Sequence, residues 1–343
     1  MKKTLMLMLL VGAVIGFAFA GGSQDSASGA GAAAPALEKV EFLLNWKITG
    51  DHSPYYVALE KGWYKEEGLD VNVVVGQGSG FSVQAIDTGK ADIAISDAPV
   101  PITNRQKGAN VKLIGIIFDK HPNCSFFWKS SGIKTPQDLA GKSVAVPATD
   151  GHKVMWPAFA KKIGVDEKSI RFINIEPAAK VAALASKNAD VVFELFTARP
   201  FMEAAIPKED LGYFVWSDHG FDCYAHSYIT SDETIQKRPE MLRKFLKATY
   251  RAWDYVLKNP TEAIEILAKY HPINKDEYIA NLYVVMEFFK TERYKNNGIG
   301  YIDPDRIKIT YDLVNEYQSP LSFPVNDCYD NRFLPNPPFK YNF

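Results

Sequence analysis

Short apolar runs and stretches with helical spacing alternate along the chain from residue 40 onward. The short runs predict buried strands, and apolar residues that recur every three or four positions predict helices. A strand–helix–strand order repeated in this way is typical of a mainly parallel sheet covered by helices. The predicted strands are 40–45, 69–75, 91–96 and 111–118, and the predicted helices are 54–61 and 81–88.

The same alternation returns in a second stretch of the chain. Residues 89–95 resemble residues 187–193, because each segment combines a helix end, a turn with an aspartate and a buried strand. This repeat predicts two similar lobes rather than one continuous sheet. In the second stretch the predicted strands are 142–146, 170–175 and 190–196, and the predicted helices are 152–163 and 178–187.

The last third of the chain is predicted to be mostly helical. Pro239 suits the first turn of a helix, and the residues after it carry an apolar stripe at helical spacing, which predicts a face packed on the core. The proline-rich tail from Ser319 is predicted to run over the surface in an extended form. The stripe comprises Met241, Phe245, Ala248, Ala252 and Tyr255, and further helices are predicted at 261–269, 275–290 and 303–317.

The N-terminus carries the pattern of a secretory signal peptide. Lys2 and Lys3 precede an apolar run, 4–19, which ends in an A-x-A-like site and is shorter than the ~20 residues that a spanning helix needs. We therefore predict a signal peptide at 1–20 rather than a membrane anchor. The small and polar residues of 21–36 predict a flexible linker, since they bury too little apolar surface to become ordered. The mature protein is expected in the periplasm or on the outer face of the cytoplasmic membrane.

The charge and the cysteine content argue against several classes of protein. The formal net charge of -1 at pH 7 argues against nucleic-acid binding, which needs dense positive charge. Cys124, Cys223 and Cys328 are far apart and fit no zinc or redox motif, so we expect small core or pocket residues, with one disulfide left open. The chain has neither a G-x-S-x-G nor an H-E-x-x-H motif. No catalytic residue, metal or cofactor is therefore expected.

Residues just beyond the predicted strands are the candidate ligand contacts, because ligands of α/β proteins bind beyond the carboxyl ends of strands. Trp46 is interpreted either as a core residue or as a flat surface for a planar ligand. Glu194 interrupts an apolar strand and needs a polar partner, so it either faces the ligand cleft or makes a structural hydrogen bond. The loop 76–80 is either an anion cradle or a tight turn. The candidate ligand-binding residues are Asn45, Trp46, Asp51, His52, Gln77, Ser79, Asp97, Asp119, Asp150, Trp156, Glu194, Phe196 and Tyr224.

Four segments resemble, in the same order, the nitrate/sulfonate/taurine and thiamine-pyrimidine group of ABC solute-binding proteins. They are 54–71, 89–94, 132–142 and 239–248. The resemblance implies the two-lobe periplasmic-binding-protein fold of type II, with a mainly parallel sheet flanked by helices in each lobe and a cleft between the lobes. A monomer that delivers its ligand to ABC permease and ATPase subunits is expected. The implied lobe 1 is 37–125 with 227–343, lobe 2 is 126–226, and the hinges lie near Ser125–Phe127 and Ala225–Tyr228.

The residue types at the strand ends bear on the ligand. Members of this group that bind oxyanions need cationic donors, and the strand-end loops offer only Lys120 and Arg199. Members that bind ring compounds use aromatic stacking with a few polar anchors, which Asn45, Trp46 and Glu194 resemble. We therefore favour riboflavin, then a thiamine pyrimidine precursor, then an alkyl sulfonate, taurine or nitrate. The aromatic candidates are Trp46, Phe127, Trp128, Trp156, Phe196 and Tyr224.

One branch of the resembling group is an enzyme. It is a thiamine-pyrimidine synthase that uses its own histidine and pyridoxal phosphate and carries a cysteine-rich iron-binding motif. The matching stretch here is 221–226, which contains one cysteine, Cys223. The predicted signal peptide also argues against a cytoplasmic synthase. We therefore expect a binding protein and not an enzyme, with a synthase-like activity as the alternative from a different class.

Overall fold

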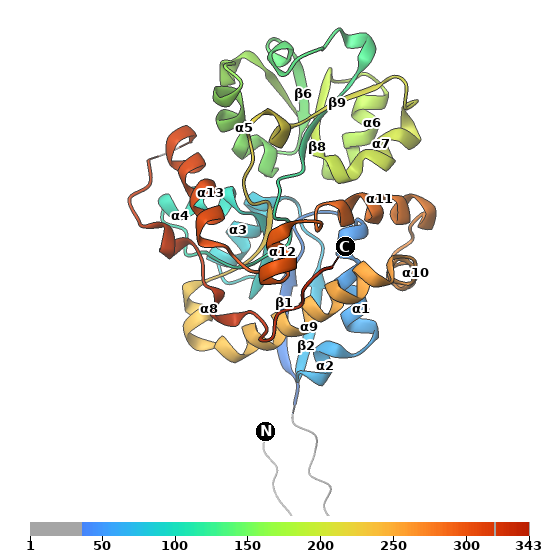
Figure 1. The fold of residues 1–343 in the computed structure, drawn as a ribbon. Coiled ribbons are helices and arrows are strands. Elements are labelled where there is room, and N and C mark those ends of the chain that lie inside the picture. Colours follow the sequence, from blue (N-terminus) through green and yellow to red (C-terminus); the bar gives the residue numbers. More distant parts are fainter. Residues whose placement is uncertain (1–35, 319, 343) are drawn as a thin grey trace, which may run out of the picture. The chain divides into compact units, whose positions relative to one another are not determined.

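The computed structural model describes residues 36–318 and 320–342, so the predicted signal peptide and all of the predicted linker except Ala36 lie outside the described residues. Two five-stranded sheets form the framework (Figure 1). The first sheet has the order β2-β1-β3-β10-β4 and the second has the order β7-β6-β8-β5-β9. The strands of the first sheet are β1 (Glu38–Leu43), β2 (Leu69–Val74), β3 (Ile93–Asp97), β4 (Lys112–Ile116) and β10 (His226–Thr230). Those of the second are β5 (Asn123–Trp128), β6 (Ser143–Val146), β7 (Arg171–Asn174), β8 (Val191–Leu195) and β9 (Leu211–Val215).

Each sheet contains one strand that enters from the other sheet and runs antiparallel to its neighbours. β1 is parallel to β2 and β3, whereas β10 lies antiparallel between β3 and β4. In the second sheet β6 is parallel to β7 and β8, whereas β5 lies antiparallel between β8 and β9. The two-lobe α/β fold is thus confirmed, and each sheet is mixed, with one antiparallel strand among parallel ones.

The chain passes between the two sheets at residues 117–122 and again at 216–225. The first hinge was expected near Ser125–Phe127, but these residues lie inside β5 and pair with β8 and β9. The connection therefore comes earlier in the chain, because the apolar run that begins at Asn123 is already paired within the second sheet. The lobe boundaries at residues 125/126 and 226/227 stay predictions.

Helices cover the faces of both sheets (Figure 1). The tail, predicted to be extended, also contains two short 3-10 turns, Val325–Cys328 and Asn331–Phe333, and Tyr329 forms a bridge with Leu113 at the edge of the first sheet. The helices are α1 (Ser53–Glu60), α2 (Trp63–Glu66), α3 (Ser79–Asp87), α4 (Pro99–Gln106), α5 (Gly151–Lys162), α6 (Lys180–Ala185), α7 (Arg199–Ala205), α8 (Asp232–Lys237), α9 (Pro239–Lys258), α10 (Pro260–Tyr270), α11 (Lys275–Glu287), α12 (Glu292–Asn297) and α13 (Pro304–Tyr317).

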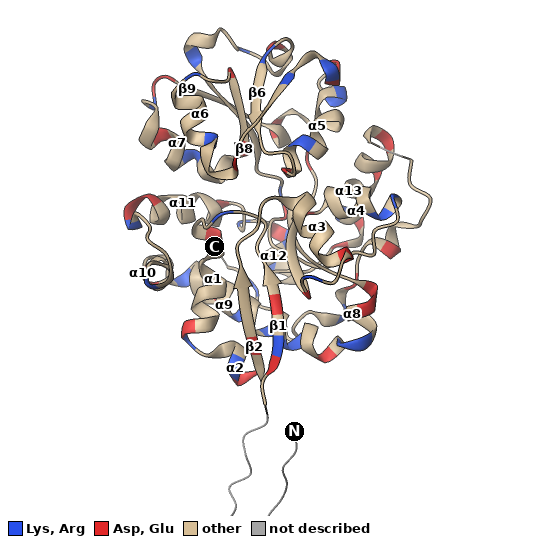
Figure 2. Ribbon diagram, turned by 180° about the vertical axis from the view of Figure 1, so that it is seen from behind, with Lys and Arg blue, Asp and Glu red and all other residues tan. Residues whose placement is uncertain are grey.

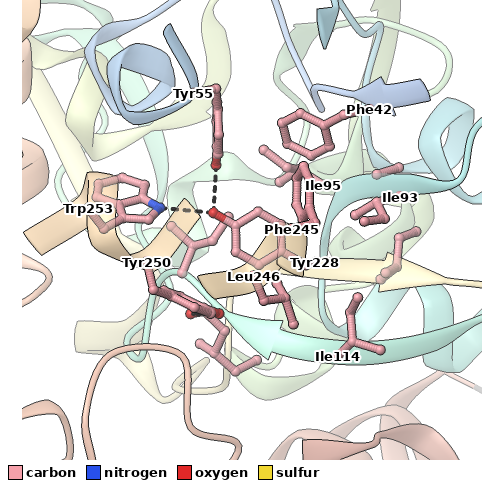
Figure 3. Close-up of a cluster of buried hydrophobic side chains, with 14 of the residues drawn as sticks. Phe42, Tyr55, Ile93, Ile95, Ile114, Tyr228, Phe245, Leu246, Tyr250 and Trp253 are labelled. Carbon is pink, nitrogen blue, oxygen red and sulfur yellow. Dashed lines mark hydrogen bonds between the residues drawn. The ribbon is translucent and has the colours of Figure 1, made fainter. Parts of the chain in front are cut away.

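The largest core cluster surrounds the first sheet and includes the packed face of α9. The predicted stripe on α9 is confirmed, since its members are buried except Tyr255, which is half-buried. Aromatic rings fill the space beneath, and Tyr228 of β10 lies at their centre (Figure 3). Its hydroxyl accepts a hydrogen bond from Trp253 Nε1 at 2.9 Å and lies 3.0 Å from the hydroxyl of Tyr55. Hydrogen bonds of this kind let polar ring atoms enter a core without loss of partners.

The three cysteines are core residues. Cys124, Cys223 and Cys328 are free and buried, and each belongs to a different hydrophobic cluster. The prediction of small core residues is confirmed, and the disulfide that the sequence left open is not formed.

The outer helices carry both signs of charge. Figure 2 shows Lys and Arg interspersed with Asp and Glu along them, and several form ion pairs between helices, such as Lys269 with Glu60 and Arg251 with Glu66. Among the described residues, no helix combines the length and the apolar character that crossing a membrane requires.

Candidate functional site

Polar residues from both sheets meet at two small cavities. Each cavity has a volume of about 30 Å³, which is close to the volume of one water molecule. Both cavities are lined by Asn45, Trp46, Glu194, Leu195 and His226. The first cavity is also lined by Gly78, Asp97, Asp150, Gly151, His152 and Lys180, and the second by Lys47, Thr49, Asp51, His52, Val181, Thr197, Ala198 and Phe201.

A chain of hydrogen bonds fixes Asn45, which follows β1. The backbone N–H of Thr49 donates to His52 Nδ1 at 3.0 Å, so the ring proton of His52 is on Nε2 and points to Asn45 Oδ1, 3.1 Å away. Asn45 Nδ2 in turn donates to His226 Nε2 at 2.9 Å. Burial lowers the pKa of His52, which keeps the ring neutral and suited to this arrangement.

Asp97, the last residue of β3, has one satisfied and one open carboxylate oxygen. Ser79 Oγ donates to Asp97 Oδ2 at 3.0 Å and accepts from the backbone N–H of Asp97. The other oxygen, Oδ1, lies 3.4 Å from His226 Nε2 and 3.8 Å from His121 Nε2. Burial lowers the pKa of His121 to about 3, so this ring is neutral and leaves the carboxylate charge largely uncompensated.

Lys180, the first residue of α6, is buried among groups of opposite charge. Its Nζ lies 2.7 Å from Asp150 Oδ2 and 3.4 Å from Glu194 Oε2. The same atom lies 4.5 Å from the centroid of the Trp46 ring, within the range of a cation–π contact. Burial alone would lower the pKa of Lys180, but the two carboxylates outweigh it and raise the pKa above the usual value.

Three buried polar atoms at the first cavity have no hydrogen-bond partner among the described residues. They are Trp46 Nε1, Asp97 Oδ1 and His152 Nε2. The indole can only donate and the carboxylate can only accept. His152 Nδ1 lies 2.7 Å from Asp150 Oδ1 and donates to it, so in the tautomer with one ring proton Nε2 is an acceptor. Buried polar groups without partners are costly, so these three atoms are candidates for contacts with a ligand.

Eight of the candidate residues lie at or directly behind the cavities. Asn45, Trp46, Asp51, His52, Asp97, Asp150 and Glu194 line them, and Ser79 supports Asp97 from behind. Glu194 is buried with 7% exposure and its Oε1 accepts from the backbone N–H of Leu195. Rules based on strand ends succeeded here because β1, β3 and β8 all direct their carboxyl ends to the same region.

The other five candidates have different surroundings. Asp119 accepts from Arg293 Nε at 2.7 Å, and Trp156 Nε1 donates to the carbonyl of Glu167 within the second core. The hydroxyl of Tyr224 accepts from the backbone N–H of Asp303, and the ring is buried in the first core. The side chains of Gln77 and Phe196 line two separate grooves.

Lys180 is the site residue that the sequence reasoning missed. It follows β7 through the 3-10 turn Pro177–Ala179, and this strand end was left out of the candidate loops. The two basic residues considered instead, Lys120 and Arg199, line a separate groove of about 640 Å³ and pair with Asp218 and Glu203. The strand-end loops predicted from the sequence thus contain only these two basic residues, whereas Lys180 lines the first cavity.

The glycine-rich loop 76–80 serves close backbone packing. A Cβ on Gly76 would lie 1.7 Å from the carbonyl oxygen of Leu44, so only glycine fits there. The N–H of Gly78 donates to the carbonyl of Asn45, and the N–H of Gly80 donates to the carbonyl of Thr149. Because these two N–H groups are occupied, the structure favours the tight-turn interpretation over the anion cradle.

The profile of the family described as NMT1/THI5 like matches residues 49–263. The chain belongs to this family. A formylaminopyrimidine-binding protein of Halalkalibacterium halodurans is 26% identical over 253 residues, which cover 74% of this chain and 74% of that protein. A 4-amino-5-hydroxymethyl-2-methylpyrimidine phosphate synthase of Legionella pneumophila is 26% identical over 308 residues, which cover 88% of this chain and 94% of that protein.

Solved structures support the fold of this NMT1/THI5-like protein. The periplasmic aliphatic sulphonate binding protein SsuA from Escherichia coli superposes with a TM-score of 0.62 at 16% identity, covering 90% of this chain and 95% of that one. At this level of identity the likeness concerns the fold, which is that of the periplasmic binding proteins.

Proposed function

We propose that this chain is the extracytoplasmic ligand-binding component of an ABC importer, and that it takes an aminopyrimidine related to the pyrimidine of thiamine. The observation that carries the proposal is the set of three unpartnered polar atoms at the first cavity, on Trp46, Asp97 and His152. Family membership and the named formylaminopyrimidine-binding relative support the ligand class. The periplasmic-binding-protein fold supports delivery to an importer.

The hydrogen-bonding pattern of the site suits an aminopyrimidine. An exocyclic amine offers two N–H donors, which complement the acceptors Asp97 Oδ1 and His152 Nε2. A ring nitrogen accepts, which complements the N–H of Trp46. The two cavities are far smaller than the ~300 Å³ of typical ligand pockets, so the ligand enters when the lobes separate and is enclosed when they close.

The charge of the site disfavours an oxyanion. Asp97, Asp150 and Glu194 line the first cavity, and the ammonium of Lys180 is already shared by two of these carboxylates. A sulfonate or nitrate would therefore meet buried negative charge without a free cation. Alkyl sulfonates, taurine and nitrate rank last for this reason.

The two reasons for favouring riboflavin as the ligand are weakened by the surroundings of the cavities. One reason was the scarcity of basic residues at the strand-end loops, and Lys180 adds a buried ammonium beside Trp46. The other was a set of aromatic walls, but Phe127, Trp156 and Tyr224 are buried in cores and do not line either cavity. Trp46 alone among the aromatic candidates lines both cavities, which suits a single six-membered ring better than a three-ring flavin.

A synthase is the second candidate function, favoured by the long alignment with the Legionella relative. The cysteines do not support it, because they lie in three different clusters. Among the described residues, no group of three or more His, Cys, Asp or Glu side chains is arranged to hold a metal ion. Recovery of the pyrimidine unchanged after incubation, checked by chromatography, separates binding from turnover.

Calorimetric titration tests the proposal. We expect saturable binding of formylaminopyrimidine and of 4-amino-5-hydroxymethyl-2-methylpyrimidine, and weaker or absent binding of riboflavin and taurine. Asp97→Asn should weaken pyrimidine binding by about tenfold to a hundredfold, because an amide replaces a charged acceptor. The matched control is Asp218→Asn, whose side chain is 59% exposed. Binding of taurine or riboflavin alone would overturn the assignment.

A further inference from the structure

The ammonium of Lys180 occupies a position at the first cavity that suits a cation. Two carboxylates and one ring face surround it, from Asp150, Glu194 and Trp46. The lysine is 1% exposed, so almost no water shares this position. Asp150 and Glu194 belong to the same lobe as Lys180, whereas Trp46 follows β1 of the first sheet. The lysine therefore brings its charge to the junction where the ligand is proposed to bind.

An aminopyrimidine is a weak base and can compete for that position. Its ring nitrogen can take a proton, and the flat cation that results would suit a cation–π contact and two carboxylates. With Lys180 in place, a second cation a few ångströms away would be repelled. Without Lys180, the same carboxylates would favour the protonated ligand.

We propose that Lys180 is a specificity-determining residue whose ammonium fills the cation position of the site, so that the site takes its ring ligand as the neutral base. The proposal rests on the proposed binding of an aminopyrimidine. It assigns the lysine a role in selecting the charge state of the ligand, beyond the hydrogen-bonding pattern derived above.

Other titratable groups face the same region, and they are present both in the unchanged chain and in its Lys180 variants. His152 of α5 lies 2.7 Å from Asp150, and His226 of β10 lines both cavities. The pKa of Asp150 is held below its usual range because Lys180 and His152 outweigh the effect of burial. Proton uptake is therefore compared between variants at one pH, so that these other groups contribute equally to each measurement and cancel in the difference.

The test uses two probes of nearly equal shape. They are neutral 4-amino-5-hydroxymethyl-2-methylpyrimidine and its permanently charged N1-methyl derivative, titrated calorimetrically in buffers of different ionisation enthalpy. The unchanged chain should bind the neutral probe more tightly and take up little or no proton. Lys180→Met should shift the ratio of the two dissociation constants toward the cation by at least about tenfold, and should take up close to one proton per neutral probe bound.

A matched control is available on the same lobe. Lys187 Nζ lies 4.7 Å from the Trp128 ring centroid, but this lysine is exposed and lines neither cavity. Lys187→Met makes the same chemical change and should leave both the ratio and the proton uptake as in the unchanged chain. The double variant Lys180→Met/Glu194→Gln keeps the net charge of the cluster, and it should return the ratio toward the neutral probe.

The outcomes separate the two proposals. If neither probe binds the unchanged chain, the aminopyrimidine assignment fails. If both probes bind and Lys180→Met changes neither ratio nor proton uptake, the role of Lys180 fails while the assignment stands. Thermal denaturation first shows whether Lys180→Met folds. If it does not fold, a preference of the unchanged chain for the N1-methyl cation overturns the proposal, and a preference for the neutral probe supports it.

Discussion

At the scale of single residues, Tyr228 shows how one polar atom supports a core. Its hydroxyl contacts Tyr55 and Trp253, and all three side chains are fully buried (Figure 3). Tyr228→Phe should lower the free energy of unfolding by about 1–3 kcal/mol, because the N–H of Trp253 would be left buried without a partner. Chemical denaturation measures the change. Tyr283→Phe, at a side chain with 51% exposure, is the control and should be nearly neutral, and equal effects of the two substitutions would contradict this account.

Single site residues were predictable from the sequence where they directly follow a strand. Asn45 and Asp97 lie at the carboxyl ends of neighbouring strands of the first sheet, which share an edge. Glu194 lies at the carboxyl end of β8 in the second sheet, and all three residues line the first cavity. Lys180 was not predictable in this way. A 3-10 turn separates it from β7, so its position depends on tertiary packing and not on the end of a strand. Trp156 was a candidate ligand contact but packs in the second core. Its position in a helix does not show from the sequence whether its side chain points toward the cleft or toward the core.

At the scale of elements, α5 links helix capping to the charge of the site. The side chain of Asp150 caps this helix by accepting from the backbone N–H of His152 at 2.8 Å, and it also pairs with Lys180. Burial raises its pKa, but the interactions with Lys180 and His152 outweigh burial, so the folded pKa lies below the unfolded value of about 3.9. The stability that this group contributes is therefore present above that value and lost as the pH falls through the folded pKa.

Asp150→Asn should flatten the acid limb of the stability curve. Asparagine can still cap the helix, so the difference isolates the charge. The free energy of unfolding of the unchanged chain should fall more steeply than that of Asp150→Asn as the pH is lowered from about 5 to 2. Denaturant titrations at several pH values measure this. Asp305→Asn, at an exposed position in the first turn of α13, should leave the slope unchanged, and parallel curves for Asp150→Asn would contradict the assignment.

The elements themselves were predictable to different degrees. Amphipathic helices such as α9 were recognised because one face repeats at helical spacing. The pairing of β5 and β10 was not predictable, because the strands that each of them pairs with lie far away in the sequence. Local pattern indicates a strand, whereas its partners depend on where the chain crosses between lobes. For this reason the first hinge was placed inside β5 instead of before it.

At the scale of the whole molecule, α13 ties together the two connections between the sheets. Its Arg306 is 4% exposed and donates to the carbonyl of Asp119, at 3.0 Å from Nη2, in the first connection. The same side chain donates to the carbonyl and the carboxylate of Asp222 in the second connection. The helix also packs against α4 and α5, which cover different sheets. A motion of the lobes relative to each other would therefore bend two segments that the guanidinium of Arg306 joins.

Arg306→Met should loosen this arrangement. The lost hydrogen bonds to a carboxylate and two carbonyls should lower the free energy of unfolding by about 1.5–3 kcal/mol. Small-angle scattering without ligand should show a larger radius of gyration than the unchanged chain, and saturating pyrimidine should still compact it, because closure depends on contacts at the cavities. Lys308→Met on the same helix removes an exposed ion pair with Asp312 and should change neither quantity. An unchanged radius of gyration in Arg306→Met would contradict this role. It would show that the packing of α13, and not the side chain of Arg306, holds the two connections in place.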